Sequence, residues 1–435
     1  MSTPKRTVAI ACQGGGSHTA FTAGVLSRLL QPDVLEHYDI IGLSGTSGGA
    51  ICATIAWSAL INGRPETAGD LLTSFWTDNA ASLPAERLLN MSLLWASQWE
   101  DWLPRAQASP YTHGGSDWSS DLLRRTIDGT VDVAAGQARA LELGADAPLL
   151  VLSAVDAVRG NFRAFSSRDG DICTDAILAS AAIPNLFRSV HLEGGTYWDG
   201  LFSQNPPIRE LHNLHPDEIW VIQVNPTTVS REPKTAAEIT SRRNELAGNL
   251  SLFQELAHIE AIDKWLANGT ITSPTLKHCV VRVVERRRTW RTMTWGAASK
   301  LNRDPAFIQE LLALGREQAE EQIHGVAFEK AWRSGDLDQL LSHVAPDAEF
   351  DSTHPDAALA PTTDRDRIRQ YVADVGLRVD NSRTRLCREH LEWQVRAGDR
   401  PGTRARVKVD LDTAGRARRV RITDDRPPIP AESTR

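Results

Sequence analysis

The sequence predicts an α/β protein in which a parallel sheet is flanked by helices and followed by a smaller α+β domain. Its first third alternates short β-rich runs with helical patterns, which is the order of a parallel sheet covered on both faces. From about residue 305 onward a long helical pattern precedes a series of strands, which is typical of an α+β domain. The 435 residues exceed the ~100–200 of one ordinary domain, so we expect two or three compact units.

Six elements predict where the chemistry of the first domain lies. We expect strands at Thr7–Cys12, Tyr38–Leu43, Leu149–Ala154 and Ile219–Val224, with helices at Thr19–Leu30 and Gly48–Ala59. The last two strands are near-continuous apolar runs, as central parallel strands are when both faces are buried. In open α/β sheets the active groups lie at the carboxyl ends of such strands.

The stretch from Leu83 to Trp118 interrupts this pattern. Its four tryptophans lie among Pro, Ser and Gly residues: Trp95, Trp99, Trp102 and Trp118. We interpret the stretch as an insertion with a small core of its own, because tryptophan side chains are usually buried. The alternative is a lid or a lipid-contacting surface over the site.

The second domain is expected to begin near residue 323. A helix from Pro305 to Arg333 is followed by the turn Ser334–Asp336, a short helix and strands around Thr384–Val395, Thr403–Asp410 and Arg416–Thr423. We therefore expect a first domain at residues 1–322, a second at 323–425, and a disordered tail rich in proline and charge at 426–435.

Composition indicates a globular cytoplasmic protein and excludes several classes. A charged share of 24% and a net charge of -7 spread over mixed segments give no basis for nucleic-acid binding. The five cysteines lie far apart without CxxC pairs, so we expect neither a disulfide framework nor a zinc site. No other metal and no cofactor are expected. The amino terminus runs into a glycine-rich loop too soon for a signal peptide. The longest apolar run, Ile51 to Ile61, is shorter than the ~20 residues of a spanning helix, so any membrane contact is expected to be peripheral.

The strongest chemical signal is Gly45–Thr46–Ser47–Gly48–Gly49, which follows an apolar strand and opens a helical pattern. A serine on a sharp strand-to-helix turn needs neighbours without bulky side chains, and the elbow residues Gly45 and Gly49 supply them. The turn exposes the hydroxyl, and the helix directs its positive end toward charge developing on an attacked carbonyl. The alternative is a glycine-rich turn with an incidental serine.

The second signal is Gly14–Gly15–Gly16, directly after the first strand. Backbone N–H groups in such a loop can converge on one anion, which suits an oxyanion hole or a phosphate. A nucleotide site would need GxxxxGK[ST] or a complete GxGxxG with a ribose-binding acid, and neither is present. The sequence therefore favours an oxyanion hole.

A serine hydroxyl becomes a good nucleophile only when a base accepts its proton. Four residues in turn-like, glycine-flanked settings are candidates: Asp199, which follows an expected hairpin at Glu193–Gly195, and the histidines His18, His113 and His191. Spacing alone leaves the choice among them open.

These blocks together resemble the patatin-like phospholipase family over roughly residues 5 to 320. Three further stretches agree, and the last two resemble a bacterial subgroup: Ala179–Phe187, Asp199–Pro207 and Gln223–Pro226. The resemblance implies a catalytic dyad of Ser47 and Asp199, with Gly14, Gly15 and Gly16 as the oxyanion hole.

One departure from this family concerns the glycine loop. The family usually has Arg or Lys and then Gly two and three residues after the third glycine, whereas this chain has His18 and Thr19. A neutral imidazole gives a weaker field than a guanidinium, and its charge depends on pH near neutrality. His18 either alters the support of the oxyanion or only packs against the first helix.

Residues 326–423 resemble the polyketide-cyclase-like (ketosteroid-isomerase-like) cone fold, on the stretches Phe328–Leu337 and Pro346–Phe350. Some such domains are enzymes, and many serve only binding or dimerisation, so fold likeness says little about function. The pocket candidates are His343, Asp351, His354 and His390, each of which we interpret as structural. The resemblance favours a homodimer through this domain.

The resulting expectation is a cytoplasmic serine lipid acyl hydrolase whose partner is a lipid or another acyl ester, with peripheral membrane contact. The same dyad could cleave a polyester or a soluble ester, or pass the acyl group to an acceptor other than water. A catalytically silent protein that binds lipid or a partner is the alternative from another class. The complete set of serine, aspartate and glycine blocks argues against it.

Overall fold

The chain divides into two compact units, Met1–Ala319 and Glu320–Arg435. The computed structural model describes residues 4–84, 86–88, 90–91, 109–111, 115–184, 186–229, 231–287, 297–355, 357–375, 378–379, 384–387, 390–396, 404–412 and 414–424. The division lies inside helix α11 (Pro305–Ser334), which contributes to both units and also contains the expected boundary at residue 322.

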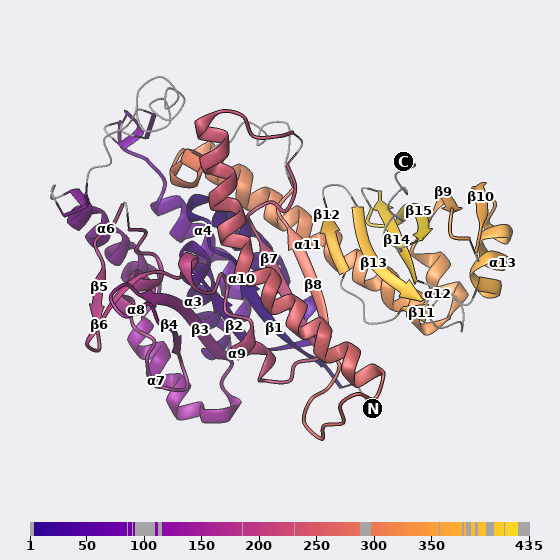
Figure 1. Ribbon diagram of the computed structural model, residues 1–435, viewed down its shortest axis with the longest axis horizontal. Coiled ribbons are helices and arrows are strands. Elements are labelled where there is room, and N and C mark those ends of the chain that lie inside the picture. Colours follow the sequence, from indigo (N-terminus) through magenta and orange to yellow (C-terminus); the bar gives the residue numbers. More distant parts are fainter. Residues whose placement is uncertain are drawn as a thin grey trace, which may run out of the picture. The chain divides into compact units, whose positions relative to one another are not determined.

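A mixed sheet forms the centre of the first unit (Figure 1). Its strands are β1 (Arg6–Cys12), β2 (Tyr38–Gly45), β3 (Leu149–Asp156), β4 (Phe162–Ser166), β5 (Val190–Leu192), β6 (Gly195–Asp199), β7 (Glu218–Gln223) and β8 (Val280–Glu285). Among the described residues their order is β8-β7-β1-β2-β3-β6-β5, with β4 beside β3. Strands β8, β7, β1, β2 and β3 run parallel, as expected, whereas β4, β5 and β6 add antiparallel pairs.

Helices cover both faces of this sheet (Figure 1). They are α1 (Ala20–Leu29), α2 (Pro32–Leu35), α3 (Gly48–Ile61), α4 (Ala68–Asp78), α6 (Gly115–Thr130), α7 (Val133–Leu143), α8 (Thr174–Ser180), α9 (Arg209–His212) and α10 (Ala236–Ala267), with single 3-10 turns at η1 (Gly16–Thr19), η2 (Pro65–Thr67), η3 (Gly144–Asp146), η4 (Gly200–Phe202) and η5 (Ala297–Leu301). Helix α3 is buried along nearly its whole length, which explains the apolar run in its sequence.

Helix α10 has no counterpart among the expected elements. Thr235 and Glu238 begin it with a capping box, in which each side chain accepts a hydrogen bond from the backbone of the other residue. Leu252, Leu256 and Ile259 of α10 pack in one apolar core with residues of β1, β3, β7 and β8. Because this burial fixes α10 against the sheet, its polar side chains are held near the strand ends.

Strand register brings the expected chemical residues to one edge of the sheet. Cys12 at the end of β1 pairs with Gly45 on one side and with Ile222 on the other. The glycine loop, the Ser47 elbow and the chain after β7 therefore leave the sheet side by side. Asp199 ends β6 opposite Ala154 of β3, so the antiparallel hairpin β5–β6 carries it toward the same edge.

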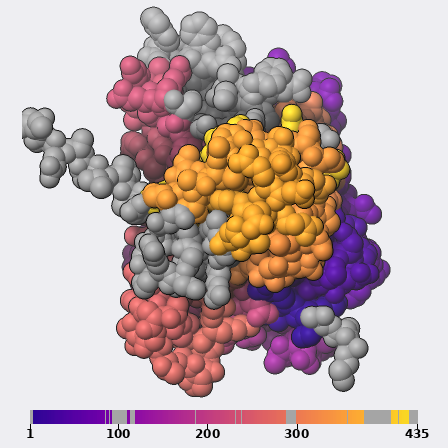
Figure 2. All heavy atoms as spheres, turned by 90° about the vertical axis from the view of Figure 1, so that its right-hand side faces the viewer, coloured from indigo at the N-terminus to yellow at the C-terminus, as the bar shows by residue number. Residues whose placement is uncertain are grey.

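The second unit is a smaller assembly of helices and strands, whose orange and yellow segments gather into one body in the space-filling view (Figure 2). Besides the end of α11 it contains α12 (Leu337–Ser342), α13 (Arg365–Val375), β9 (Val344–Ser352), β10 (Leu359–Thr362), β11 (Arg378–Val379), β12 (Thr384–Cys387), β13 (His390–Arg396), β14 (Arg404–Leu411) and β15 (Ala417–Asp424). Among the described residues the order is β10-β9-β15-β14-β13-β12, with β11 beside β13.

The second unit differs from the sequence expectation in two respects. The stretch expected as strand around Thr384–Val395 forms the antiparallel pair β12 and β13. β9, β10 and α13 were not expected, and β9 pairs parallel with β15. The tail at residues 426–435 lies outside the described residues. The cone-fold assignment stays a prediction.

Candidate active site

Ser47 lies on the sharp turn that the sequence predicted. Its backbone has a φ of 57° and a ψ of -129°, a conformation in which a residue with a Cβ is strained. Ser180 holds this backbone in place, because the N–H of Ser47 donates to both the carbonyl oxygen (3.1 Å) and the Oγ (3.0 Å) of Ser180. The elbow thus fixes Ser47 at the start of α3 without using its hydroxyl.

The glycines of the elbow are required by close backbone contacts. A Cβ on Gly45 would lie 2.4 Å from the carbonyl oxygen of Gly49, and a Cβ on Gly49 would lie 2.3 Å from that of Cys12. Both distances are shorter than van der Waals contact allows. Gly45 and Gly49 therefore let β1, β2 and α3 meet at the turn, as the sequence predicted for this pair.

Asp199 is the ionisable residue beside Ser47. Its side chain is 1% exposed, and its Oδ1 accepts a hydrogen bond from the N–H of Leu201 at 2.8 Å. Burial raises the pKa of Asp199 to about 7, while the Leu201 N–H, the Ser47 hydroxyl and the charge of Lys300 each act to lower it. Within the described residues, Oδ2 of Asp199 has no hydrogen bond of ordinary geometry. This carboxylate oxygen is therefore available to accept a proton.

The glycine loop lies against the elbow, but its first glycine has another use than the one expected. A Cβ on Gly14 would lie 3.0 Å from Cβ of Ser47, so the loop and the nucleophile are in close contact. The N–H of Gly14 donates to Oδ1 of Asn205 at 2.7 Å. Because this donor is occupied, Gly14 can contact an oxyanion only if Asn205 releases it, and the expected role of Gly14 in the oxyanion hole stays a prediction. Gly15 and Gly16 keep their backbone N–H groups free of hydrogen bonds within the described part of the chain.

A buried network of amide side chains fixes the back of the glycine loop. Gln13 donates through Nε2 to the carbonyl oxygen of Gly248 and to Oδ1 of Asn249, both in α10. Asn205 donates through Nδ2 to the same Gly248 carbonyl at 3.0 Å. Asn225 donates through Nδ2 to the carbonyl oxygen of Gly14 at 3.3 Å. The loop is therefore tied to α10 and to the ends of β1 and β7.

Sequence reasoning gave no role to Asn205, Asn225 or Lys300. The two asparagines were noted only as parts of stretches that resemble bacterial relatives. Their positions could have indicated a role in the site. Both asparagines precede a proline, and Asn225 follows the carboxyl end of β7. Lys300 comes from η5 and donates from Nζ to Oδ1 of Asn225 at 2.7 Å. No local pattern in the sequence indicates that contact.

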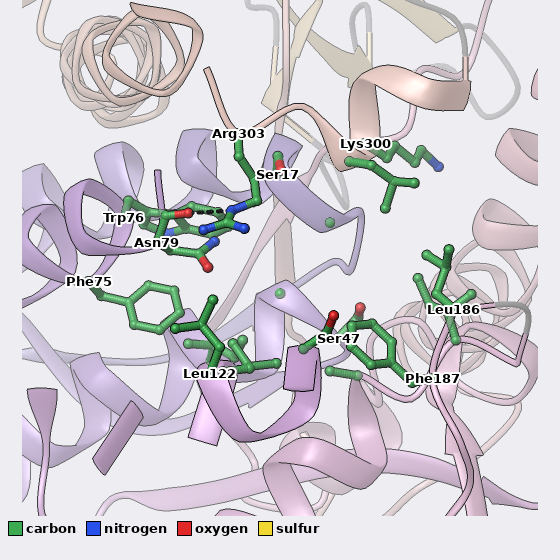
Figure 3. A pocket seen from close by; sticks show the side chains of 18 of the residues that line it. Ser17, Ser47, Phe75, Trp76, Asn79, Leu122, Leu186, Phe187, Lys300 and Arg303 are labelled. Atoms are coloured by element: carbon green, nitrogen blue, oxygen red, sulfur yellow. Dashed lines mark hydrogen bonds between the residues drawn. The ribbon is translucent and has the colours of Figure 1, made fainter. Parts of the chain in front are cut away.

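An apolar pocket of about 300 Å³ opens beside Ser47 (Figure 3). Figure 3 shows Phe75, Leu122, Leu186 and Phe187 around the serine, with Arg303 and Asn79 at one end of the pocket. Leu186 and Phe187 belong to the stretch Ala179–Phe187 that the sequence singled out. Arg303 donates from Nε to the carbonyl oxygen of Asn79 at 2.6 Å. The walls suit a hydrocarbon chain that ends near the nucleophile.

Trp118 also lines this pocket, on α6, and is 51% exposed. The expectation that Trp118 belongs to a small separate core is therefore wrong. Its half-exposed position at the pocket fits the alternative of a surface over the site. Trp95, Trp99 and Trp102 lie outside the described residues.

The histidines named as alternative bases lie in other settings. His18 is buried, and its Nε2 is 2.8 Å from Oγ of Ser299. Its ring packs near that of Phe307, with centroids 6.1 Å apart. His191 lies exposed in the hairpin, with Nδ1 3.2 Å from Oγ1 of Thr196. His113 lies outside the described residues.

Thr19, which stands where the patatin-like family usually has glycine, forms a hydrogen bond within the glycine loop. Its Oγ1 donates to the carbonyl oxygen of Gly16 at 2.6 Å. A Cβ on Gly48 would lie 2.1 Å from that same Oγ1, so Thr19 packs directly against the start of α3. Thr19 therefore joins the loop to the elbow.

The candidates in the second unit have structural surroundings. Asp351 accepts from Nε of Arg421 at 3.0 Å. His354 is 1% exposed. Burial lowers the pKa of His343, and the charge of the neighbouring His324 lowers it further. The side chain of His390 lies outside the description. These contacts favour the structural interpretation.

Neither a metal site nor a membrane-spanning helix occurs among the described residues. Within them, no group of three His, Cys, Asp or Glu side chains is placed to hold a metal ion. Helices long and apolar enough to traverse a bilayer are likewise absent from that part of the chain. The four cysteines whose side chains are described, Cys12, Cys52, Cys173 and Cys279, are free thiols.

A family model of patatin-like phospholipases matches residues 10–212, which contain the glycine loop, the elbow and Asp199. Residues 10–212 are therefore similar to a patatin-like phospholipase domain. The first unit, which contains this match, has the expected architecture of a central sheet flanked by helices, and the match supports a lipid ester hydrolase at the level of the family. A search of curated proteins found no match.

Three solved structures show distant likeness to the chain. VipD from Legionella pneumophila is 13% identical with a TM-score of 0.32, over 78% of this chain and 80% of that chain. ExoU in its heterodimeric complex with SpcU, from the type III secretion system of Pseudomonas aeruginosa, is 15% identical with a TM-score of 0.26, over 78% and 65%. An NTF2-like protein of unknown function from Cytophaga hutchinsonii is 8% identical with a TM-score of 0.21, over 24% and 89%. The patatin-like domain is identified by the family model and not by these scores.

Proposed function

We propose that this protein is a serine lipid acyl hydrolase in which Ser47 and Asp199 form a catalytic dyad. The observation that carries the proposal is the pairing of a strained, pocket-facing serine with a buried aspartate whose pKa burial raises to about 7. A general base works best when its pKa lies near the working pH. Asp199 meets this condition without a histidine.

The reaction follows from these positions. Asp199 accepts the proton of the Ser47 hydroxyl while Oγ attacks the ester carbonyl carbon. The carbonyl oxygen gains negative charge and is stabilised by the free N–H groups of Gly15 and Gly16 and by the amino end of α3. The ester C–O bond then breaks, and the alcohol leaves with the proton that Asp199 held.

The acyl-serine that remains is released by water. Asp199 accepts a proton from the water as its oxygen attacks the acyl carbon, and returns the proton to Oγ of Ser47 when the bond to serine breaks. The acyl chain lies along Ile51, Phe75, Leu122 and Phe187 during both steps. These apolar walls are the reason to propose a fatty acyl ester as the substrate class.

Ester hydrolysis by variants tests this function. With p-nitrophenyl octanoate, we expect Ser47→Ala to lose all but a ~10⁻³ to 10⁻⁴ share of kcat, and Asp199→Asn to lose nearly as much. Ser44→Ala is the matched control, because Ser44 is buried in β2 and its Oγ has no partner among the described residues. Full activity in Ser47→Ala would overturn the proposal, and so would full activity in Asp199→Asn.

A further inference from the structure

The glycine loop carries no permanent positive charge of its own. From Gln13 to Thr19 it contains neither lysine nor arginine. An anion that forms beside this loop gains the field of backbone dipoles and of any cation that a distant segment supplies. Lys300 is such a cation, because it lines the pocket together with Gly16 and Ser47 (Figure 3).

We propose that Lys300 is a positioning residue of the dyad. Its ammonium group holds Asn225 and the glycine loop in place, and its charge keeps the Asp199 carboxylate ready to accept the Ser47 proton. The proposal rests on the dyad function proposed above.

The mechanical link runs through backbone and side chain. A Cβ on Gly16 would lie 2.2 Å from the carbonyl oxygen of Lys300, so the loop and η5 are in direct contact. Because Gly16 has no side chain, the Lys300 backbone can approach it this closely, and its φ of 58° is a conformation that favours glycine. From the same residue, Nζ reaches Oδ1 of Asn225, whose Nδ2 donates to the carbonyl oxygen of Gly14. Lys300 therefore contacts the loop directly at Gly16 and indirectly, through Asn225, at Gly14.

The electrostatic link runs from Lys300 to Asp199. Burial raises the pKa of Asp199, and the charge of Lys300 opposes this rise. Burial is the main effect on Lys300 and lowers its pKa to about 8. The negative charges of Glu245 and Asp199 act to raise this pKa, and the positive charge of Arg286 acts to lower it. Lys300 is thus mostly protonated near pH 7, the pH at which Asp199 loses its proton. Arg303 also lines this pocket, and His18 lies next to it in the glycine loop.

The pH dependence of catalysis follows with a definite sign. Hydrolysis requires charged Asp199, so kcat/KM rises as pH passes about 7. Above a pH of about 8, Lys300 loses its proton, and its neutral amine holds Asn225 and the glycine loop less firmly than the ammonium group does, so kcat/KM declines. We therefore expect a narrow maximum between these two values.

Three variants measured from about pH 5 to about pH 10 test the inference with p-nitrophenyl octanoate. In Lys300→Met we expect the acid limb to move to higher pH, with a ~3- to 10-fold lower kcat/KM near pH 6, because an opposite charge no longer supports the carboxylate. Lys300→Arg should keep the acid limb in place and lose the alkaline limb, because a guanidinium stays charged. Lys264→Met, an exposed lysine of α10, should match the wild-type profile.

Each outcome decides a different claim. If Ser47→Ala retains activity, the dyad function fails and the Lys300 profiles have no bearing on it. If activity depends on Ser47 but Lys300→Met keeps both limbs of the wild-type profile, the inference about Lys300 is overturned. Should Lys300→Met fail to fold, Lys300→Arg decides alone, since an unchanged alkaline limb near pH 8 contradicts the role of this ammonium group.

Discussion

Burial gives Asp199 and Ser47 their chemical character. An aspartate in water is charged at neutral pH and is a weak base, whereas Asp199 is 1% exposed and its pKa is raised to about 7. A carboxylate in this state can exchange a proton with a hydroxyl near neutral pH. Ser47 was predicted from its glycine-flanked turn and Asp199 from the resemblance to the patatin-like family, but the raised pKa of Asp199 depends on surrounding segments that no local pattern reveals.

The same burial makes stability depend on pH. Because the folded-state pKa of Asp199 is raised above its ordinary value of 3.8, the folded protein binds this proton more tightly than the unfolded chain does. The stability that this tighter proton binding adds to the folded state is fully present below a pH of about 4 and is lost as pH rises through about 7. Asp199→Asn removes the titration, so we expect its Tm to exceed that of the wild type by more at pH 8 than at pH 4.

Thermal unfolding at these two pH values measures the effect. Asp169→Asn, an exposed residue of the turn after β4, is the control and should change Tm equally at both. An Asp199→Asn difference that is the same at pH 4 and pH 8 would show that the folded-state pKa is not raised.

The elbow and the glycine loop are the two elements that assemble the site. The elbow was predictable because its requirement is local: small residues on both sides of a serine between a strand and a helix. The glycine loop was predictable only in part, because the partner of Gly14 is Asn205, far along the chain. Helix α10 was missed, although Thr235 and Glu238 carry the signature of a helix start.

A methyl group added to the elbow should abolish the site. In Gly45→Ala the new Cβ would lie 2.4 Å from the carbonyl oxygen of Gly49, so β2 and α3 must separate. We expect a loss of activity of more than about 100-fold, together with a loss of roughly 1–3 kcal/mol of stability. Gly129→Ala in α6 meets no atom within 4 Å and serves as the control, with unchanged activity and a slightly raised Tm. Near wild-type kinetics in Gly45→Ala would disprove this requirement.

Removing the amide that holds the glycine loop should affect the transition state more than binding. Asn205→Ala leaves the N–H of Gly14 without a partner, at a cost of about 1–3 kcal/mol, whereas the carbonyl oxygen of Gly248 keeps its hydrogen bond from Gln13. In the proposed mechanism the loop contacts charge that develops only during reaction, so we expect kcat to fall about 10- to 100-fold with little change in KM. Steady-state kinetics beside the exposed control Asn213→Ala measure this split. A raised KM at constant kcat would assign Asn205 to substrate binding.

At the scale of the whole molecule, the site lies within one of two units. Ser47, Asp199, Gly14, Asn205, Asn225 and Lys300 all belong to Met1–Ala319. The βα alternation and the change of pattern after residue 305 were sufficient to predict two domains of different class. The sequence did not predict that the segment around Lys300, just before α11, would reach the site, because such a contact depends on tertiary packing.

Hydrogen exchange can show which unit responds to the active site. After Ser47 is blocked by a fluorophosphonate, we expect slower amide exchange in peptides from residues 13–19, 45–61 and 199–209, because the adduct occupies the pocket that they surround. Peptides from residues 344–424 should exchange at their original rates. Equal slowing in both sets would contradict the assignment of the site to the first unit alone.

The central claim is that Ser47 is activated by Asp199. Peptide mass spectrometry after treatment with a fluorophosphonate probe tests it most directly, in the wild type and in Asp199→Asn. We predict a single modified residue, Ser47, in the wild type and a labelling rate at least about 100-fold lower in Asp199→Asn. Labelling of a different residue would contradict the claim, as would equal labelling of Ser47 in the two proteins.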